Sequence, residues 1–451
     1  SSLDVLEGRA GTVMKRLLLV VFAMPGAAWP QDELPAVPPP VLDTTDVVAP
    51  FPRNPLSGRA ILSSTRTAIP RGQSGSSVTV ISGEELRRSG QSLLHDALRG
   101  TAGLDVVRSG SPGQQTSVFI RGAESRHTKV MLDGIPLNDP SSPSRAFDFS
   151  NLAVENIERV EVIRGPQSTL YGSDAIGGVI NIVTRRGQGP ASYRFRTMGG
   201  RYGTVQQSAS VSGSNDRVYY SLGGSYFESS GFTTAAPRLG NSEDDGFRNG
   251  NLSTRLGWLV NEQTDIDVVV RYTDADSQSD SFEYPVGPVD NLLRKLTTET
   301  FAMRTQLRNE MYDGMIEQKF GFGYMDLNRR DTDPGFGGTP AYDGSTVKFD
   351  WQANVLLYET DRVRNVFTTG LENTTETASS SFTDRRSLYA TGFFLQDHVI
   401  VDENWSTVLG ARWDRYSAAG PANTYRVTSR YSLEESGTAF RGSIGTGFRA
   451  P

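Results

Sequence analysis

Residues 156–185 read NIERVEVIRGPQSTLYGSDAIGGVINIVTR, two apolar runs on either side of a glycine-rich loop. The runs 157–163 and 178–184 are rich in Val and Ile, which predicts two short buried or half-buried strands. The loop between them opens with Arg164-Gly165-Pro166, and its glycines suit a backbone with positive φ or a close neighbour. We expect no helix to begin on this loop, and no Lys-Ser or Lys-Thr follows it. A phosphate-binding loop is therefore disfavoured, while an ordinary hairpin stays open.

The stretch resembles the end of the plug domain of TonB-dependent outer-membrane receptors, whose pattern is E-V-x-R-G-P-x-S-x-x-Y-G-x-x-A-x-G-G-x-I-N-I. Two earlier stretches, TSVFIRG at 116–122 and KVMLDGIPLN at 129–138, resemble the I-R-G and V-L-D-G-x-P motifs of the same domain. Within that family the likeness is greatest to the cobalamin (vitamin B12) receptors. The resemblance implies a mixed α/β plug domain followed by antiparallel strands of a 22-strand-type transmembrane β-barrel, in the outer membrane of a Gram-negative bacterium.

The composition is compatible with this fold. A chain of 451 residues exceeds the size of a single core, so at least two domains are expected. The mean hydropathy of -0.38 would suit a soluble protein, yet it also suits a transmembrane β-barrel, because only alternate residues of each strand face lipid. The chain has no cysteine, which excludes disulfides, thiolate metal ligands and thiol nucleophiles. Its net charge of -6 argues against nucleic acid as a partner.

The sequence divides into five regions. Residues 1–13 precede Met14 and are interpreted as non-native or read-through sequence. Residues 14–30 contain a basic start, a short apolar run and small residues, which predicts a signal peptide; a buried helix is the alternative. The Pro-rich region 31–63 is expected to be disordered. The plug is assigned to 64–190 and the N-terminal part of the barrel to 191–451.

A TonB box is expected within the Pro-rich region. The stretch DTTDVVA at 43–49 resembles the acidic-Thr-x-x-Val-Val strip that precedes the plug in this family. Its assigned residues are Asp43, Thr44, Thr45, Val47, Val48 and Ala49. A β-prone strip of this kind can add as a strand to the sheet edge of a partner, which the resemblance implies is TonB of the inner-membrane energising complex.

The region after residue 190 reads as a meander of alternating polar and apolar residues, and a soluble antiparallel sandwich shares that alternation. Thirteen strands are expected at 192–200, 203–212, 216–228, 248–260, 264–276, 297–311, 314–329, 344–360, 363–377, 385–400, 404–418, 422–434 and 437–448. Within the plug we expect a strand at 76–81 and helices at 82–90 and 93–98. The charged plug residues Arg121, Arg164, Arg185, Glu158 and Glu161 are expected to pair with the barrel wall. The final GTGFRAP resembles a family motif that further strands follow, so we expect a C-terminally truncated barrel.

Acidic residues gather in two long loops of the expected barrel. The D-x-D-G-F pattern of the cobalamin receptor's calcium loop falls on Glu243, Asp245, Gly246 and Phe247, with Glu243 in place of Asp. Asp280 and Asp290 are assigned from the next loop. Carboxylates brought together in this way suit calcium and would repel one another without it. Thr233 stands where a further acidic ligand is expected, so one ion rather than two is one alternative, and a solvated acidic loop is another.

The expected function is TonB-dependent active import of a cobalamin-like corrinoid. The assigned substrate contacts are Gln114, Gln115, Asn138 and Arg145 in apical plug loops. A ferric siderophore is the alternative substrate, and a passive porin or an adhesin is the alternative class. The three histidines lack ligand-like spacing and no Gly-x-Ser-x-Gly occurs, so neither an enzyme nor an organic cofactor is expected. Further expected partners are outer-membrane lipid and a phage or bacteriocin.

Overall fold

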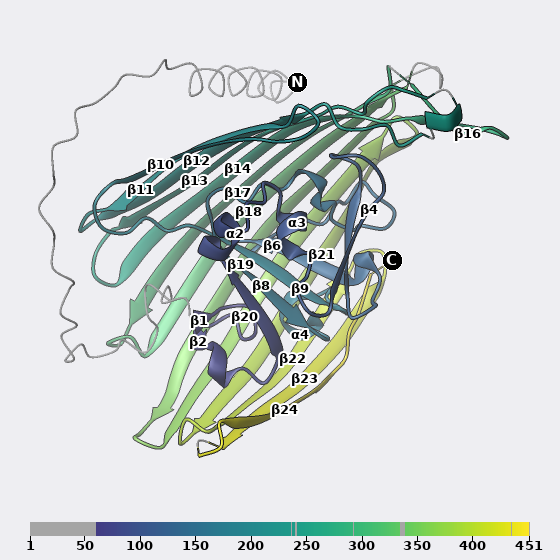
Figure 1. The fold of residues 1–451 in the computed structure, drawn as a ribbon. Helices are drawn as coiled ribbons and strands as arrows, with labels where there is room; N and C mark the ends of the chain where they lie inside the picture. Colours follow the sequence, from purple (N-terminus) through teal and green to yellow (C-terminus); the bar gives the residue numbers. More distant parts are fainter. Residues whose placement is uncertain are drawn as a thin grey trace, which may run out of the picture. The chain divides into compact units, whose positions relative to one another are not determined.

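The computed structural model describes residues 60–235, 237–239, 241–291, 293–333, 339–433 and 435–450. The expected signal peptide, and the expected TonB box at 43–49, lie outside the described residues. Two sheets dominate the described part, a large antiparallel sheet that forms a wall and a smaller mixed sheet that belongs to the plug (Figure 1).

The wall is a 13-stranded antiparallel sheet. Each of its strands pairs with the wall strand that follows it along the chain. Its strands are β10 (Ser192–Gly199), β11 (Val205–Ser214), β12 (Val218–Ser229), β13 (Phe247–Leu259), β14 (Thr264–Gln278), β17 (Lys295–Met311), β18 (Ile316–Thr332), β19 (Ala341–Glu359), β20 (Val363–Ser380), β21 (Thr383–Val401), β22 (Trp405–Tyr416), β23 (Gly420–Leu433) and β24 (Thr438–Gly445). The expected fold is confirmed, and each of the thirteen expected strands coincides with one of these to within a few residues. A small hairpin of β15 (Ser281–Glu283) and β16 (Gly287–Val289) lies between β14 and β17.

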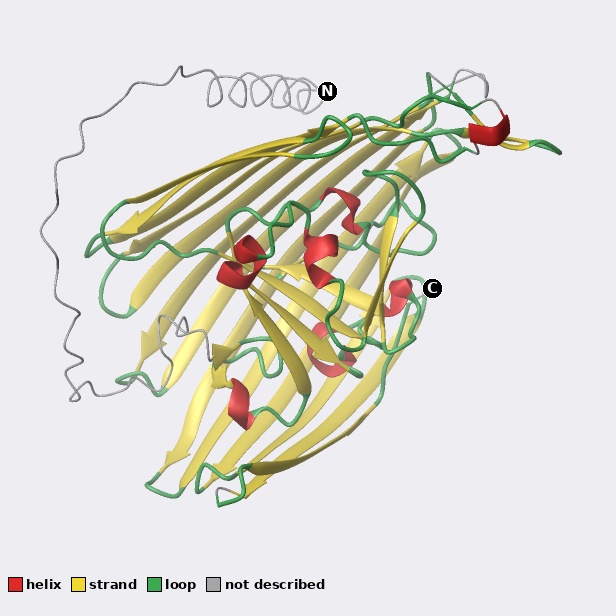
Figure 2. Cartoon of the chain, in the orientation of Figure 1, coloured by secondary structure: helices red, strands yellow, loops and turns green. Residues whose placement is uncertain are grey.

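The plug lies on the concave side of the wall (Figure 2). Its five-stranded sheet has the order β3-β8-β9-β6-β7, in which only β6 and β9 pair in parallel. The plug strands are β1 (Ala60–Ile61), β2 (Ile69–Pro70), β3 (Ser77–Ser82), β4 (Leu104–Arg108), β5 (Thr116–Ile120), β6 (Thr128–Leu132), β7 (Ile135–Pro136), β8 (Ile157–Arg164) and β9 (Gly178–Thr184). The plug helices are α2 (Gly83–Arg88), α3 (Leu94–Leu98) and α4 (Ser168–Tyr171). No helix among the described residues is long and apolar enough to cross a bilayer.

Helices α2 and α3 begin within one residue of their expected starts, α3 without a side-chain cap, and one further plug helix is an exception to the expectations. Ser82 caps α2 by accepting a hydrogen bond from the Glu85 N–H, and the Glu85 carboxylate accepts one from the Ser82 N–H in return. The exception is α4, which forms within the glycine-rich loop that was expected to start no helix. Only one turn long, it ends at Gly172, whose φ of 69° suits glycine. The expectation was wrong because packing against β22 and β23, rather than local propensity, supports so short a helix.

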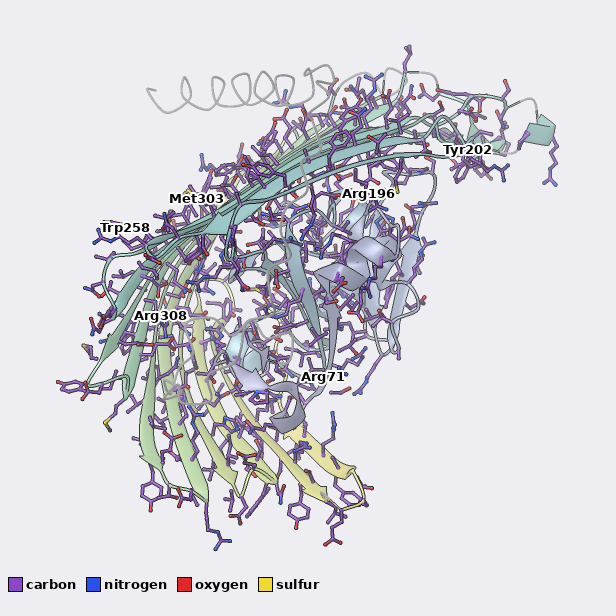
Figure 3. All side chains as sticks on the ribbon, turned by 60° about the vertical axis from the view of Figure 1, so that its left-hand side comes forward. Arg71, Arg196, Tyr202, Trp258, Met303 and Arg308 are labelled. Carbon is purple, nitrogen blue, oxygen red and sulfur yellow. The ribbon has the colours of Figure 1, made fainter. Side chains whose placement is uncertain are left out.

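The wall is polar on its concave face and apolar on its convex face, the reverse of a soluble protein. On β19 the side chains of Lys348, Gln352 and Asn354 are buried, whereas Phe349 is 55% exposed. Trp258 of β13 is 51% exposed and lies on the convex side (Figure 3). This inversion is what a strand that faces lipid on one side and a polar interior on the other requires.

The plug has a hydrophobic core of its own that continues into the wall. Its main cluster contains Leu132, Ile135 and Phe149 and includes Ala302 and Met325 from strands β17 and β18. Such contiguous apolar contact, excluding water, fixes the position of the plug against these strands.

Two charged plug residues do not pair with the wall as expected. Glu161 is fully buried, and its carboxylate lies 2.6 Å from Arg159 Nε while accepting hydrogen bonds from the Ser63 N–H (2.9 Å) and the Leu62 N–H (3.1 Å). Arg164 donates to the Thr79 hydroxyl (2.9 Å) and to a plug carbonyl. The expectation was wrong for both because the plug sheet supplies its own partners.

Replacing Glu161 is expected to destabilise the plug strongly. Glu161→Ala removes the acceptor of several buried donors and leaves Arg159 buried without its counter-charge, which costs about 3–5 kcal/mol. The measurement is plug stability by chemical denaturation in detergent. Glu84→Ala is the matched control, because the Glu84–Arg88 pair is solvent-exposed and such pairs contribute at most about 1 kcal/mol. Equal effects of the two substitutions would contradict the role given to Glu161.

Candidate ligand and metal site

The two ends of the wall differ in the length of their connections. At one end β12 and β13 are joined by residues 230–246, and β14 and β17 by residues 279–294. At the other end the neighbouring connections are the short turns 215–217, 260–263 and 312–315. In outer-membrane barrels the longer loops face the outside. In such a barrel the two long loops would mark the outward-facing end of the wall.

An acidic cluster joins these two loops. One carboxylate oxygen from each of Glu243, Asp280 and Asp290 lies within 4.8 Å of the others. Asp245, the fourth residue expected from the sequence, is linked to Asp280 through Thr234. The Thr234 N–H lies 3.1 Å from an oxygen of both aspartates, and its hydroxyl lies 2.7 Å from Asp280 and 3.2 Å from Asp245. The structure thus brings together all four residues that the sequence assigned to the site.

Each of the four carboxylates has one oxygen without a hydrogen-bond partner. These buried oxygens are Glu243 Oε2, Asp245 Oδ1, Asp280 Oδ1 and Asp290 Oδ1. The other oxygen of each aspartate is anchored instead. Asp290 Oδ2 accepts from the Ser242 N–H at 2.6 Å, and Asp280 Oδ2 accepts from the Ala235 N–H at 2.6 Å. Backbone donors therefore hold the carboxylates in place while leaving four oxygens available for a cation.

Electrostatics agree with this geometry. Burial, followed by the nearby Asp280 carboxylate, raises the pKa of Asp245 from 3.8 to about 6. Burial and the neighbouring acids, Asp245 first among them, also raise the pKa of Glu243. Carboxylates that lie close together without a counter-charge raise one another's pKa. A bound cation would lower these pKa values again.

Arg294 connects the cluster to a third loop. Its guanidinium donates to the backbone carbonyl of Asp280 at 2.9 Å and lies 3.1 Å from Asp331 and 3.7 Å from Asp333, at the end of β18. Sequence reasoning missed both Arg294 and Thr234. Thr234 directly follows Thr233, the position at which an acidic ligand was sought, whereas nothing local distinguishes Arg294 from other loop arginines.

The four expected substrate contacts differ in how far their side chains are already engaged by the protein. Asn138 is buried, and its amide bonds the N–H of Val130 (3.1 Å) and the carbonyls of Thr128 (3.2 Å) and Arg145 (3.0 Å), so it supports the plug rather than facing a ligand. Arg145 is paired with Glu376 at 2.5 Å and lies 3.4 Å from Asp174, between the plug and the wall. The assignment of Asn138 is corrected, because the amide of a plug residue can be fully engaged by the plug itself.

The glutamines behave differently from the other two. Gln114 donates its amide to the Gln278 carbonyl at 2.8 Å, which ties the plug loop to the end of β14, beside the acidic loops. Gln115 is exposed. Of the four residues, Gln115 thus keeps the accessibility that a ligand contact needs.

Comparison with known proteins identifies the family. A family model for the TonB-dependent receptor plug domain matches residues 70–179, and a TonB-dependent receptor-like β-barrel model matches residues 184–451. The chain belongs to the TonB-dependent receptors. This confirms the resemblance seen in the plug motifs, and it places the receptor in the outer membrane.

The names of individual relatives refer to different substrates. The vitamin B12 transporter BtuB of Photobacterium profundum is 27% identical over 385 residues, which are 83% of this receptor and 59% of that relative. The receptor therefore spans less than two thirds of that relative's length. Among solved structures, the siderophore receptor PirA of Acinetobacter baumannii has a TM-score of 0.67 at 19% identity, covering 83% of this chain and 61% of that one. An enterobactin complex of PfeA from Pseudomonas aeruginosa, a Q482A mutant, has a TM-score of 0.66 at 17% identity, covering 83% and 63%. Likeness at these identities shows the fold.

Without a divalent cation, order in the two acidic loops is expected to fall as pH rises. The carboxyl of Asp245 binds a proton more tightly in the folded loops than in an unfolded chain, so protonation favours the folded loops. The stabilisation is present below about pH 4 and is lost as pH rises through about 6. Hydrogen exchange of residues 230–246 in chelator, corrected for intrinsic rates, measures it. Asp245→Asn should flatten the profile, and a flat profile in the unsubstituted receptor would contradict the assignment.

Proposed function

We propose that this receptor imports a cobalamin-like corrinoid across the outer membrane, driven by TonB. The observation that carries the proposal is the acidic cluster formed by Glu243, Asp245, Asp280 and Asp290 between two outer loops. The family resemblance of those loops to the calcium loops of cobalamin receptors, and the 27% identity to a vitamin B12 transporter, support the same substrate.

Calcium is the cation proposed for the cluster. The donor set fits it, because four buried carboxylate oxygens have no other partner and every available donor is oxygen, which is what a hard cation prefers. Calcium takes about 6–8 oxygens, so backbone carbonyls and water would complete the shell. Glu243 and Asp245 from the first loop, with Asp280 and Asp290 from the second, would hold it. When bound, the ion supplies the positive charge that cancels their repulsion.

The residues of this chain suggest how binding and transport are linked. Asp245 and Asp280 share Thr234, and Arg294 extends the cluster to Asp331, so ordering one loop restrains the next. Gln114 connects the plug to the end of β14, below these loops. We propose that a ligand held by the ordered loops biases the plug and that the strip 43–49 then pairs with TonB, which supplies the energy. No covalent chemistry is involved, so the receptor is proposed not to be an enzyme.

A ferric siderophore is the second candidate substrate. The siderophore receptors among the structural neighbours favour it, although they share the fold at under 25% identity. The acidic loops disfavour an anionic iron chelate unless calcium neutralises them.

A passive porin or an adhesin does not require a plug domain packed against the wall. Lipid against the convex face, and a phage or bacteriocin at the loops, are proposed as further partners.

Calcium affinity is expected to depend on Asp280. Asp280→Asn removes one charge from the cluster and should weaken calcium binding by at least about tenfold. Isothermal titration calorimetry in detergent measures the affinity. The matched control is Asp276→Asn, because Asp276 is paired with Lys295 at 3.0 Å and lies outside the cluster. An equal loss of calcium affinity in both variants would indicate a general effect of surface charge. That result would contradict a discrete site.

Cyanocobalamin binding is expected to require the cation. Equilibrium titration should give tight binding in calcium and weaker binding in chelator, because the loops that hold the ligand lose their counter-charge. The variant Glu243→Ala/Asp245→Ala/Asp280→Ala should bind weakly in both conditions. Binding of ferric enterobactin in place of cyanocobalamin would overturn the corrinoid assignment, while the family assignment would stand.

A further inference from the structure

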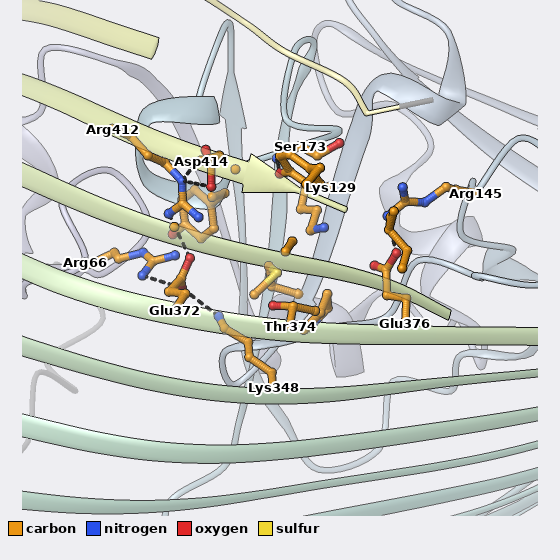
Figure 4. A pocket seen from close by; sticks show the side chains of 18 residues that line it. Arg66, Lys129, Arg145, Ser173, Lys348, Glu372, Thr374, Glu376, Arg412 and Asp414 are labelled. Carbon is orange, nitrogen blue, oxygen red and sulfur yellow. Dashed lines mark hydrogen bonds and ion pairs between the residues drawn. The ribbon is translucent and has the colours of Figure 1, made fainter. Parts of the chain in front are cut away.

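A cavity of about 50 Å³ lies between the plug and strands β19–β22 of the wall (Figure 4). It is remote in the chain from the acidic loops, and eight of its eighteen lining residues are charged. The charged residues that line it are Arg66, Lys129, Arg145, Lys348, Glu372, Glu376, Arg412 and Asp414. By volume it holds about three water-sized species, since one such species needs about 10–15 Å³ of this measure.

The wall side of the cavity is organised around Glu372. This buried carboxylate lies 2.8 Å from each of three cationic groups, the guanidinium groups of Arg66 and Arg412 and the ammonium group of Lys348. Arg412 also lies 2.8 Å from Asp414. On this side alone, three cations therefore face two carboxylates.

The plug side is organised around Asp174. Its carboxylate is fully buried and has three cationic neighbours, Lys129 at 3.7 Å, Arg145 at 3.4 Å and Arg449 at 3.5 Å. Arg145 in addition lies 2.5 Å from Glu376 of the wall. Three cations again face two carboxylates.

Around the cavity, six cationic side chains thus face four carboxylates, an excess of two positive charges. A seventh cation, Arg426, is buried nearby and donates to the Ser64 carbonyl and the Ser76 hydroxyl rather than to a carboxylate. Uncompensated charge in a site shielded from water is costly, and a counter-ion is the simplest relief.

Two of these cations retain unused donors. Arg145 Nη1 is buried and has no hydrogen-bond partner. The Lys129 side chain is 9% exposed, and its ammonium lies 3.7 Å from Asp174, beyond hydrogen-bond length. Both groups approach the same oxygen of Asp174, and both line the cavity (Figure 4). The Lys129 ammonium and Arg145 Nη1 therefore offer donors to a small guest.

We propose that this cavity binds a small inorganic monovalent anion, such as chloride, between Lys129 and Arg145. The anion accepts hydrogen bonds from the ammonium and from the free guanidinium nitrogen, and it offsets part of the positive excess. Because Lys129 and Arg145 belong to the plug while Glu376 and Glu372 belong to the wall, the anion strengthens the seating of the plug against strands β19–β22. The proposal does not depend on which substrate the receptor imports.

Crystals of the receptor grown with bromide in place of chloride test the site directly. We expect an anomalous bromide peak within hydrogen-bond distance of Lys129 Nζ and Arg145 Nη1. The peak should vanish in Lys129→Met and remain in Lys319→Met, a matched control on β18 whose ammonium pairs with Glu317 and does not line the cavity. Water alone at this position, or a carboxylate of the same receptor filling it, would overturn the proposal.

A solution measurement covers the case in which Lys129→Met fails to fold. The unfolding temperature of the unsubstituted receptor should be about 2 °C or more higher in chloride than in isethionate at equal ionic strength, because only the small anion fits the cavity. Lys319→Met should keep that difference. Equal unfolding temperatures in the two salts would contradict an anion site.

Discussion

The inner face of the wall depends on one constraint, namely that a charge is costly to bury unless an opposite charge from the plug or from a neighbouring strand lies beside it. Glu372 meets the constraint most fully, because Arg66 of the plug region and Lys348 and Arg412 of the wall all lie 2.8 Å from its carboxylate. Removing Glu372 would leave Arg66 and Lys348 buried without this carboxylate, which is far costlier than losing a surface pair. The plug and wall are consequently fitted to one another by charge as well as by the apolar contacts that reach Ala302 and Met325.

The outer loops break the same rule. Four carboxylates there keep a buried oxygen without a partner, although backbone N–H groups from Ser242, Ala235 and Thr234 anchor their positions. Interior charges such as Glu372 lie beside opposite charges of the protein itself, whereas the repulsion among these four carboxylates remains. A cation-binding site differs from a structural ion pair in this respect, because its oxygens are held in place while they lack a positive partner.

The strands were readable from the sequence because the barrel alternation is local. Each of the thirteen expected strands was found, since period-two patterning and the turn residues lie within a few positions of one another. The four acidic residues of the cluster were singled out for another reason, a resemblance to known loops carried over position by position. Thr234 and Arg294 were missed because their roles depend on partners in other loops. Asn138 was misassigned because a polar plug residue has the same sequence pattern whether it contacts a ligand or the plug's own backbone.

The sequence was enough to predict the architecture, a mixed plug followed by antiparallel strands with alternating faces, and to locate the acidic loops. Which charges pair became known from the folded receptor alone. Glu161 meets Arg159 inside the plug, whereas Arg145 crosses to Glu376 of the wall, 231 residues further along the chain. The alternation of polar and apolar residues is a property of neighbouring positions in the sequence, so it can be recognised locally. Electrostatic pairing acts over a few ångströms in space, and which residues come that close is known only once the chain has folded.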